Sequence, residues 1–303
     1  MKESIQTEIN WKQISFFLVM VIVFILLFGN DLGIIVKSNS SIEKQPKTKK
    51  EQNSLVLEDQ VLMDQVVLPI KWEDLGKQMI EVGVINQEKF ESLYNQRGGL
   101  NEEEKKLLFG TNNGKITINQ QNAGLLLNLF WAFGLANENQ ILTEGPMAEF
   151  GASGQAASTG GWTLSADLIA DHYSKHAFVI LTDQQQKLVE EVSQNIYRPC
   201  CNNPVYFPDC NHGMAMLGLL ELLASQGASE EEMYTVALQV NSYWFPDTYL
   251  TIAKYFQIRG VEWDEISPKE ILGSSYSSAS GYQQILNEVT PPQSSGGGGS
   301  CGV

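Results

Sequence analysis

The sequence predicts an all-α protein, with a helical domain of about nine to eleven helices after a single amino-terminal transmembrane helix. Three observations lead to this prediction. One apolar run near the amino terminus is long enough to cross a bilayer. Apolar residues then recur at helical spacing between capping residues and glycines. No segment alternates apolar and polar residues clearly enough to indicate a strand.

The amino-terminal run is the predicted membrane anchor, at residues 14–36 after a short tail (1–13). Its core reads ISFFLVMVIVFILLF, which is apolar except for Ser15. A span of about 20 residues can cross a bilayer, and no small-residue cleavage site follows, so a retained anchor is favoured over a cleaved signal. The lysines after the span would place the domain inside by the positive-inside rule. We nevertheless expect an extracytoplasmic domain, because amino-terminal anchors before one soluble domain usually export it.

Composition divides the rest of the chain into predicted segments. They are a Lys-rich polar linker (37–53), an amino-terminal helical half (54–150), a loop of small residues (151–162), a carboxy-terminal helical half (163–289) and a Gly/Ser tail that contains Cys301 (290–303).

Helices are predicted in the amino-terminal half from apolar spacing and capping residues. The first covers 72–82 and the second is centred on 90–94. Asn101 and Glu104 form a predicted capping box at the start of the third. The run LLLNLFWAFGL at 125–135 is too apolar for a surface helix, so we predict that it is the central buried helix.

The carboxy-terminal half is predicted to be a series of helices with short breaks. They cover residues 163–180, 183–197, 211–226, 230–244, 246–259 and a short final piece from 268. Thr182 starts the second of these in a capping box, and Asp209 or Asn211 caps the third.

Metal-binding side chains are concentrated in the loop before that third helix. Three of the four cysteines and one of the three histidines of the chain lie between residues 199 and 212. The candidate ligands are Cys200, Cys201, Cys210 and His212, with Met214 one helical turn after Cys210. These side chains hold soft and borderline ions. The window therefore predicts a transition-metal site for copper or zinc.

A histidine pair offers two further ligands. His172 and His176 are four residues apart, so both rings would project from one face of the helix 163–180. The helix 183–197 could fold back and bring them to the cysteine window. In the alternative interpretation, one ring packs in the core and the other is solvated.

The spacing of the cysteines leaves other interpretations open. The pattern Cys-Cys-x8-Cys-x-His matches no standard zinc finger, and the adjacent side chains of Cys200 and Cys201 are expected to diverge. Cys210, at a helix start that favours a thiolate, could instead attack a disulfide, with Cys200 or Cys201 resolving it. Disulfides could also simply hold the loops of a partner-binding module. Cys301 could take part in any of these or be a tail thiol without a role.

The predicted function is therefore that of a membrane-anchored metal-binding protein, with no catalytic residue assigned. A net charge of −15 argues against a nucleic-acid partner, which would require a basic surface. The predicted partners are the membrane, through the anchor, and a metal-donor or thiol-exchange protein.

Overall fold

The computed structural model describes residues 57–291. The predicted anchor, the polar linker and the tail with Cys301 lie outside the described residues. Within residues 57–291, no helix is both long enough and apolar enough to cross a membrane.

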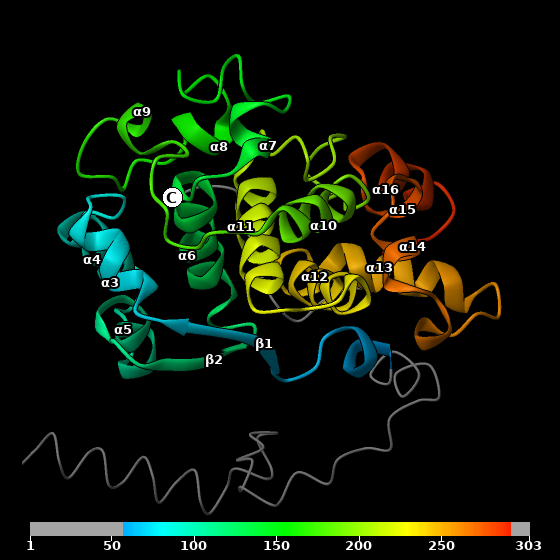
Figure 1. The fold of residues 1–303 in the computed structure, drawn as a ribbon. Coiled ribbons are helices and arrows are strands. Elements are labelled where there is room, and N and C mark those ends of the chain that lie inside the picture. Colours follow the sequence, from blue (N-terminus) through cyan, green and yellow to red (C-terminus); the bar gives the residue numbers. More distant parts are fainter. Residues whose placement is uncertain (1–56, 292–303) are drawn as a thin grey trace, which may run out of the picture. The chain divides into compact units, whose positions relative to one another are not determined.

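Most of the described chain is helical, as predicted (Figure 1). The longer helices are α3 (Leu75–Glu81), α4 (Gln87–Asn95), α5 (Glu102–Phe109), α6 (Ala123–Ala136), α10 (Asp183–Ser193), α11 (Asn211–Ser225), α12 (Glu230–Trp244), α13 (Pro246–Gln257) and α16 (Ala279–Leu286). The short ones are α7 (Gln140–Thr143), α8 (Ala157–Gly160), α9 (Ile169–His172), α14 (Pro268–Ile271), α15 (Ser274–Ser277) and the 3-10 helix η1 (Trp263–Glu265).

A two-stranded antiparallel sheet corrects the expectation that the domain contains no strand. It pairs β1 (Val66–Glu73) with β2 (Asn113–Ile118). Residues of β1 alternate strictly between buried and exposed, so Trp72, which was predicted to begin a helix, is a buried strand residue. Pro69 weakens the strand signal in the sequence, because proline has no N–H to donate to a partner strand.

The outer edge of β1 is paired with a side chain. The carboxamide of Gln226, just after α11, accepts from the backbone N–H of Lys71 at 2.8 Å and donates to its carbonyl at 2.9 Å. This side chain therefore satisfies both backbone groups of Lys71 where no strand is present.

Helices α6 and α11 form the centre of the fold. Nearly every residue of both helices is buried, which confirms the prediction of a central buried helix at 125–135. Their backbones approach closely at two glycines: a Cβ on Gly134 would lie 2.3 Å from the carbonyl oxygen of Met214, and one on Gly218 would lie 2.6 Å from that of Phe130. Because α6 and α11 come from the two predicted halves, one continuous core joins those halves.

The predicted capping boxes are confirmed, but the prediction of one long helix is wrong. The predicted capping boxes are present at Asn101 with Glu104 and at Thr182 with Gln185, and a third is found at Ser229 with Glu232. The predicted helix 163–180, in contrast, contains only the single turn α9. Ser174 has a left-handed φ of 51°, and its N–H donates to the carbonyl of Leu135. His176 likewise donates to Ala136, so this segment satisfies the last carbonyls of α6 instead of its own.

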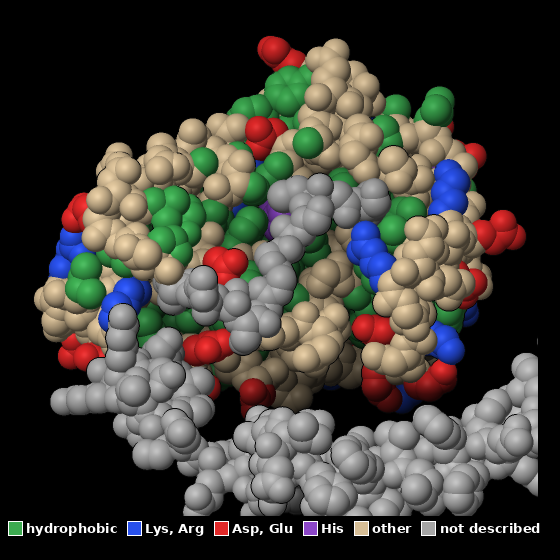
Figure 2. All heavy atoms as spheres, turned by 180° about the vertical axis from the view of Figure 1, so that it is seen from behind, with side chains coloured by type: hydrophobic (Ala, Val, Ile, Leu, Met, Phe, Trp, Pro, Cys, Tyr) green, Lys and Arg blue, Asp and Glu red, His purple; other side chains and the backbone are tan. Residues whose placement is uncertain are grey.

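Figure 2 shows one face of the molecule. Acidic side chains are scattered over this face, with lysine and arginine side chains and apolar and uncharged surface between them. The cysteine loop connects the end of α10 to the start of α11 (Figure 1).

Candidate metal centre

The three cysteines of the loop lie at the amino-terminal end of α11. Cys210 is the N-cap of this helix, and its Sγ accepts a hydrogen bond from the N–H of Gly213 at 3.4 Å. A cysteine therefore caps α11, in place of the predicted Asp209 or Asn211. Unpaired N–H groups at a helix start favour negative charge, so the cap places the sulfur where a thiolate is stabilised.

The sulfurs of Cys200, Cys201 and Cys210 converge. Their Sγ atoms are 3.5 Å apart for Cys200 and Cys210, 3.8 Å for Cys201 and Cys210, and 4.0 Å for Cys200 and Cys201. These separations exceed the bond length of a disulfide, about 2.05 Å, and all three thiols are free. Cys200 and Cys201 therefore do not diverge as expected of neighbours. Among the described Cys, His and acidic residues, only these three place donor atoms in such a group.

The buried side chain of Arg198 holds the loop in place. Its side chain is 1% exposed, and its Nε donates to Cys210 Sγ at 3.2 Å. Nη1 donates to the carbonyl of Asn203 at 2.6 Å, and Nη2 donates to the carbonyl of Phe207 at 3.1 Å and to Asp209 Oδ1 at 2.9 Å. One guanidinium thus binds three residues of the loop in addition to the sulfur of Cys210. Arg198 comes directly after the predicted helix 183–197, and the sequence pattern gave it no role; its rarity, as one of three arginines, was the available signal.

The fit of Arg198 depends on the residue at position 213. A Cβ on Gly213 would lie 2.5 Å from Nη2 of Arg198 and 2.6 Å from Cζ. Glycine in the first turn of α11 therefore leaves room for the guanidinium, because a larger side chain would displace it from its position beside the sulfur.

The three thiols differ in their pKa values. Hydrogen bonds from Cys200 and Cys201 hold the pKa of Cys210 well below its usual range, and the charge of Arg198 lowers it further. The hydrogen bonds that Cys200 makes to Cys201 and Cys210 raise the pKa of Cys200. The hydrogen bond from Cys200 lowers the pKa of Cys201, but its own bond to Cys210 and burial outweigh this and raise it to about 11. Of the three thiols, Cys210 is thus the one that ionises most readily.

Neighbouring elements hold the loop in place and leave one side open. The N–H of Ala279, at the start of α16, donates to the carbonyl of Cys201 at 2.9 Å, and the N–H of Ser158 in α8 donates to that of Asp209 at 3.0 Å. Cys200 is exposed, whereas Cys201 and Cys210 are partly buried. The cluster therefore faces solvent through Cys200.

Two predicted ligands next to the cluster lie apart from the sulfur group. The ring of His212 packs against Phe245 and Trp244, with centroids 4.4 and 5.9 Å away, and is only 2% exposed. Burial lowers the pKa of His212 to about 4; the charge of Cys210 opposes this shift and that of Arg198 adds to it, and the ring is neutral at neutral pH. Met214 is fully buried in the apolar core.

The histidine pair is close together but does not share the site. Nδ1 of His172 and Nε2 of His176 are 3.1 Å apart, and the ring of His176 also stacks on Phe178. The backbone of His176 bridges to Asn137, which contacts Glu221 near the far end of α11. Eleven residues of helix separate Glu221 from Cys210, a rise of about 16 Å. The pair and the thiols are thus two separate groups.

No protein-family model, curated protein or solved structure matches this chain.

Proposed function

We propose that Cys200, Cys201 and Cys210 together bind one transition-metal ion, zinc or copper(I). The spacing of the sulfurs carries this proposal. Three thiolates about 2.3 Å from a tetrahedral zinc ion are separated by roughly 3.8 Å. The sulfurs here are 3.5, 3.8 and 4.0 Å apart, so an ion would need little movement of the loop to be held by all three.

Charge favours zinc over copper(I). Metal binding would convert three thiols to thiolates, and a divalent ion leaves less of that negative charge uncompensated than a monovalent one. Arg198 lies against Cys210 and stabilises part of the remainder. The buried thioether of Met214 belongs to the core, so it adds no support for copper.

Three protein ligands would leave one coordination position open, on the side of exposed Cys200. Closed four-ligand sites are usually structural, whereas an open position permits exchange or reaction of the ion. This openness supports a role in handing an ion to or from a partner protein.

Native mass spectrometry of the reduced full-length protein tests metal binding. We expect one zinc or copper(I) ion per chain, which is lost in Cys200→Ser, Cys201→Ser and Cys210→Ser because each removes one of three ligands. Cys301→Ser, a thiol outside the described residues, is the matched control and should keep the ion. Absence of bound metal with all thiols reduced would refute the proposal.

The anchored, extracytoplasmic placement of this site is a further part of what we propose, supported by the apolar run at 14–28. A membrane-impermeant thiol reagent applied to intact cells should label the cysteine cluster in the Cys301→Ser variant. Deleting residues 1–36 should release the protein from the membrane fraction. Labelling only after lysis would mean that the domain faces inward.

A second candidate function, thiol–disulfide exchange, is favoured by the lowered pKa of Cys210 and by its hydrogen bond from Arg198. Cys210 would attack a substrate disulfide, forming a mixed disulfide and releasing one substrate thiolate. Cys200, whose sulfur is 3.5 Å away, would then displace the second substrate thiolate and form a Cys200–Cys210 disulfide. Two electrons pass to the substrate, and the protein is oxidised.

Alkylation kinetics distinguish this second function. In the metal-free protein, Cys210 should react rapidly at pH values below about 8.5, the pKa of an ordinary thiol. Cys210→Ser should abolish the fast phase and Cys301→Ser should retain it. A reaction rate that follows an ordinary thiol titration would argue against exchange.

A further inference from the structure

The sulfurs that would hold a metal ion are also close enough to react with one another. Cys200 and Cys210 form the closest pair, with their Sγ atoms 3.5 Å apart. A disulfide would bring these atoms to about 2.05 Å, so the two sulfurs need to approach by only about 1.5 Å. Because a sulfur in a disulfide no longer carries the thiolate charge that binds a metal, the ion and this disulfide exclude each other.

Cys201 is the sulfur that remains outside this pair. Its Sγ lies 3.8 Å from that of Cys210 and donates to the carbonyl of Asn203 at 4.0 Å. A bond between Cys201 and its neighbour Cys200 would close a strained ring across one peptide bond, and these two sulfurs are the farthest apart, at 4.0 Å. The geometry thus favours the pairing of Cys200 with Cys210, which leaves a single thiolate, too few ligands to hold a zinc ion.

Exposure determines which sulfur meets an oxidant from solvent. Cys200 is exposed, whereas Cys210 is partly buried at the start of α11. The Nε of Arg198 and the N–H of Gly213 both donate to Cys210 Sγ, so this sulfur is held in place and its thiolate is stabilised. Cys200 is therefore suited to react with the oxidant first, and Cys210 is suited to react with Cys200 afterwards.

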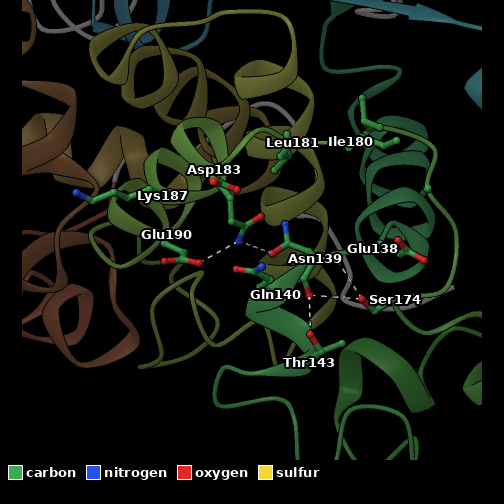
Figure 3. Close-up of a pocket in the computed structure, with 13 residues that line it drawn as sticks. Glu138, Asn139, Gln140, Thr143, Ser174, Ile180, Leu181, Asp183, Lys187 and Glu190 are labelled. Atoms are coloured by element: carbon green, nitrogen blue, oxygen red, sulfur yellow. Dashed lines mark hydrogen bonds between the residues drawn. The ribbon is translucent and has the colours of Figure 1, made fainter.

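The surroundings of the cluster favour a small oxidant. A cavity of about 510 Å³ lies between α7, α10 and the segment 174–181 (Figure 3), and another of about 600 Å³ lies between α5 and β2. No residue of the segment 199–212 lines either cavity. Neither cavity therefore seats a large oxidant beside the sulfurs, and a small molecule that arrives from solvent at Cys200 fits this surface better.

We infer that a hydroperoxide oxidises this site to a Cys200–Cys210 disulfide and thereby releases the metal ion, a form of regulation that rests on the proposed metal-binding function. First, the Cys200 thiolate attacks a peroxide oxygen: the S–O bond forms, the O–O bond breaks, and the departing hydroxide takes a proton from solvent. Next, the Cys210 thiolate attacks the sulfur of Cys200: the S–S bond forms, the S–O bond breaks, and a second hydroxide takes a proton. The two sulfurs lose two electrons, which reduce hydrogen peroxide to two waters. Both protons come from solvent, because thiolates that bind a metal have already lost theirs.

Metal release from the full-length Cys301→Ser variant tests the inference, since this change removes the cysteine outside the described residues. The variant is loaded with zinc, freed of air, and mixed with hydrogen peroxide or oxidised glutathione in the presence of a chromogenic zinc indicator. Hydrogen peroxide should release all of the bound zinc, with one peroxide consumed per ion. Oxidised glutathione at the same concentration should act more slowly, because it is larger and anionic and the protein has a net charge of −15.

Peptide mapping locates the new bond. Chymotrypsin cuts after Tyr206 and separates Cys210 from the other two cysteines of the cluster, so a disulfide joins two peptides until a reductant is added. In the metal-free protein, Cys201→Ser should still form the Cys200–Cys210 bond with hydrogen peroxide. Cys210→Ser should form no bond and should instead leave a Cys200 sulfenic acid, which dimedone traps. The two variants are matched because each removes one thiol of the cluster.

Failure of this inference can be distinguished from failure of the proposed function. If the reduced protein binds no zinc before the oxidant is added, metal binding fails and the inference fails with it. If zinc stays bound after the peroxide is consumed, or leaves without a Cys200–Cys210 bond, only the inference is overturned. Faster release by oxidised glutathione would also overturn it, because thiol–disulfide exchange would then be the route.

Discussion

Arg198 shows how one side chain can determine both the shape of a loop and the chemistry of its sulfurs. Its guanidinium reaches two carbonyls, a carboxylate and Cys210 Sγ from a fully buried position. The grouping of Cys200, Cys201 and Cys210 could be predicted from the sequence, because rare residue types are concentrated there. The role of Arg198 could not be predicted, because nothing in the spacing of residues shows that an arginine side chain hydrogen-bonds to the loop that follows it.

Replacing Arg198 should destabilise the protein. Arg198→Met keeps the aliphatic stem but leaves the carbonyls of Asn203 and Phe207 without their donor, so the free energy of unfolding should fall by about 3 kcal/mol. Urea denaturation measures this. Arg97→Met, at an exposed arginine, is the control and should change the free energy by less than about 0.5 kcal/mol. Equal stability of the two variants would mean that the buried guanidinium contributes nothing.

Among the helices, those whose defining contacts are local in the sequence could be predicted, and the one that depends on a distant partner could not. Capping boxes and the apolar run of α6 predict their helices because the relevant contacts are local. The segment 163–180 fails as a helix because its N–H groups satisfy the carbonyls at the end of α6, a partner distant in the sequence. The separation of His172 and His176 from the thiols results from the same pairing, which no local spacing encodes.

The contact between α6 and α11 depends on glycine. In Gly134→Ala, the new Cβ would lie 2.3 Å from a carbonyl oxygen of α11, so the helices must separate and the free energy of unfolding should drop by at least about 2 kcal/mol. Gly124→Ala is the control on the same helix, because a Cβ there meets nothing within 4 Å. It should be neutral or stabilising by up to about 1 kcal/mol, since alanine is the better helix former. Thermal unfolding compares the two, and similar melting temperatures would contradict the close packing.

At the level of the whole molecule, stability and pH are linked through buried His212. Its folded pKa of about 4 is below the unfolded value, so the unfolded chain binds more protons between these values. Stability from this residue is therefore fully present above about pH 6.5 and is lost as pH falls toward 4, by up to about 3 kcal/mol.

Comparison of variants isolates this effect. His212→Phe keeps an aromatic ring against Trp244 and Phe245 but cannot bind a proton, so its stability should fall less steeply between pH 6.5 and pH 4. His176→Phe is the control: that ring is only partly buried, and its replacement should alter the pH dependence less. Parallel stability curves for His212→Phe and the unchanged protein would contradict the assigned pKa.

The pairing of Gln226 with β1 has a consequence for solubility. An edge strand whose outer N–H and C=O groups are unpaired can pair with a strand of another copy. Such pairing is the first step toward fibrils. By occupying the N–H and carbonyl of Lys71, the carboxamide removes one docking point from that edge. A side chain that contributes little to the core thus helps to keep neighbouring copies from aggregating in a crowded environment.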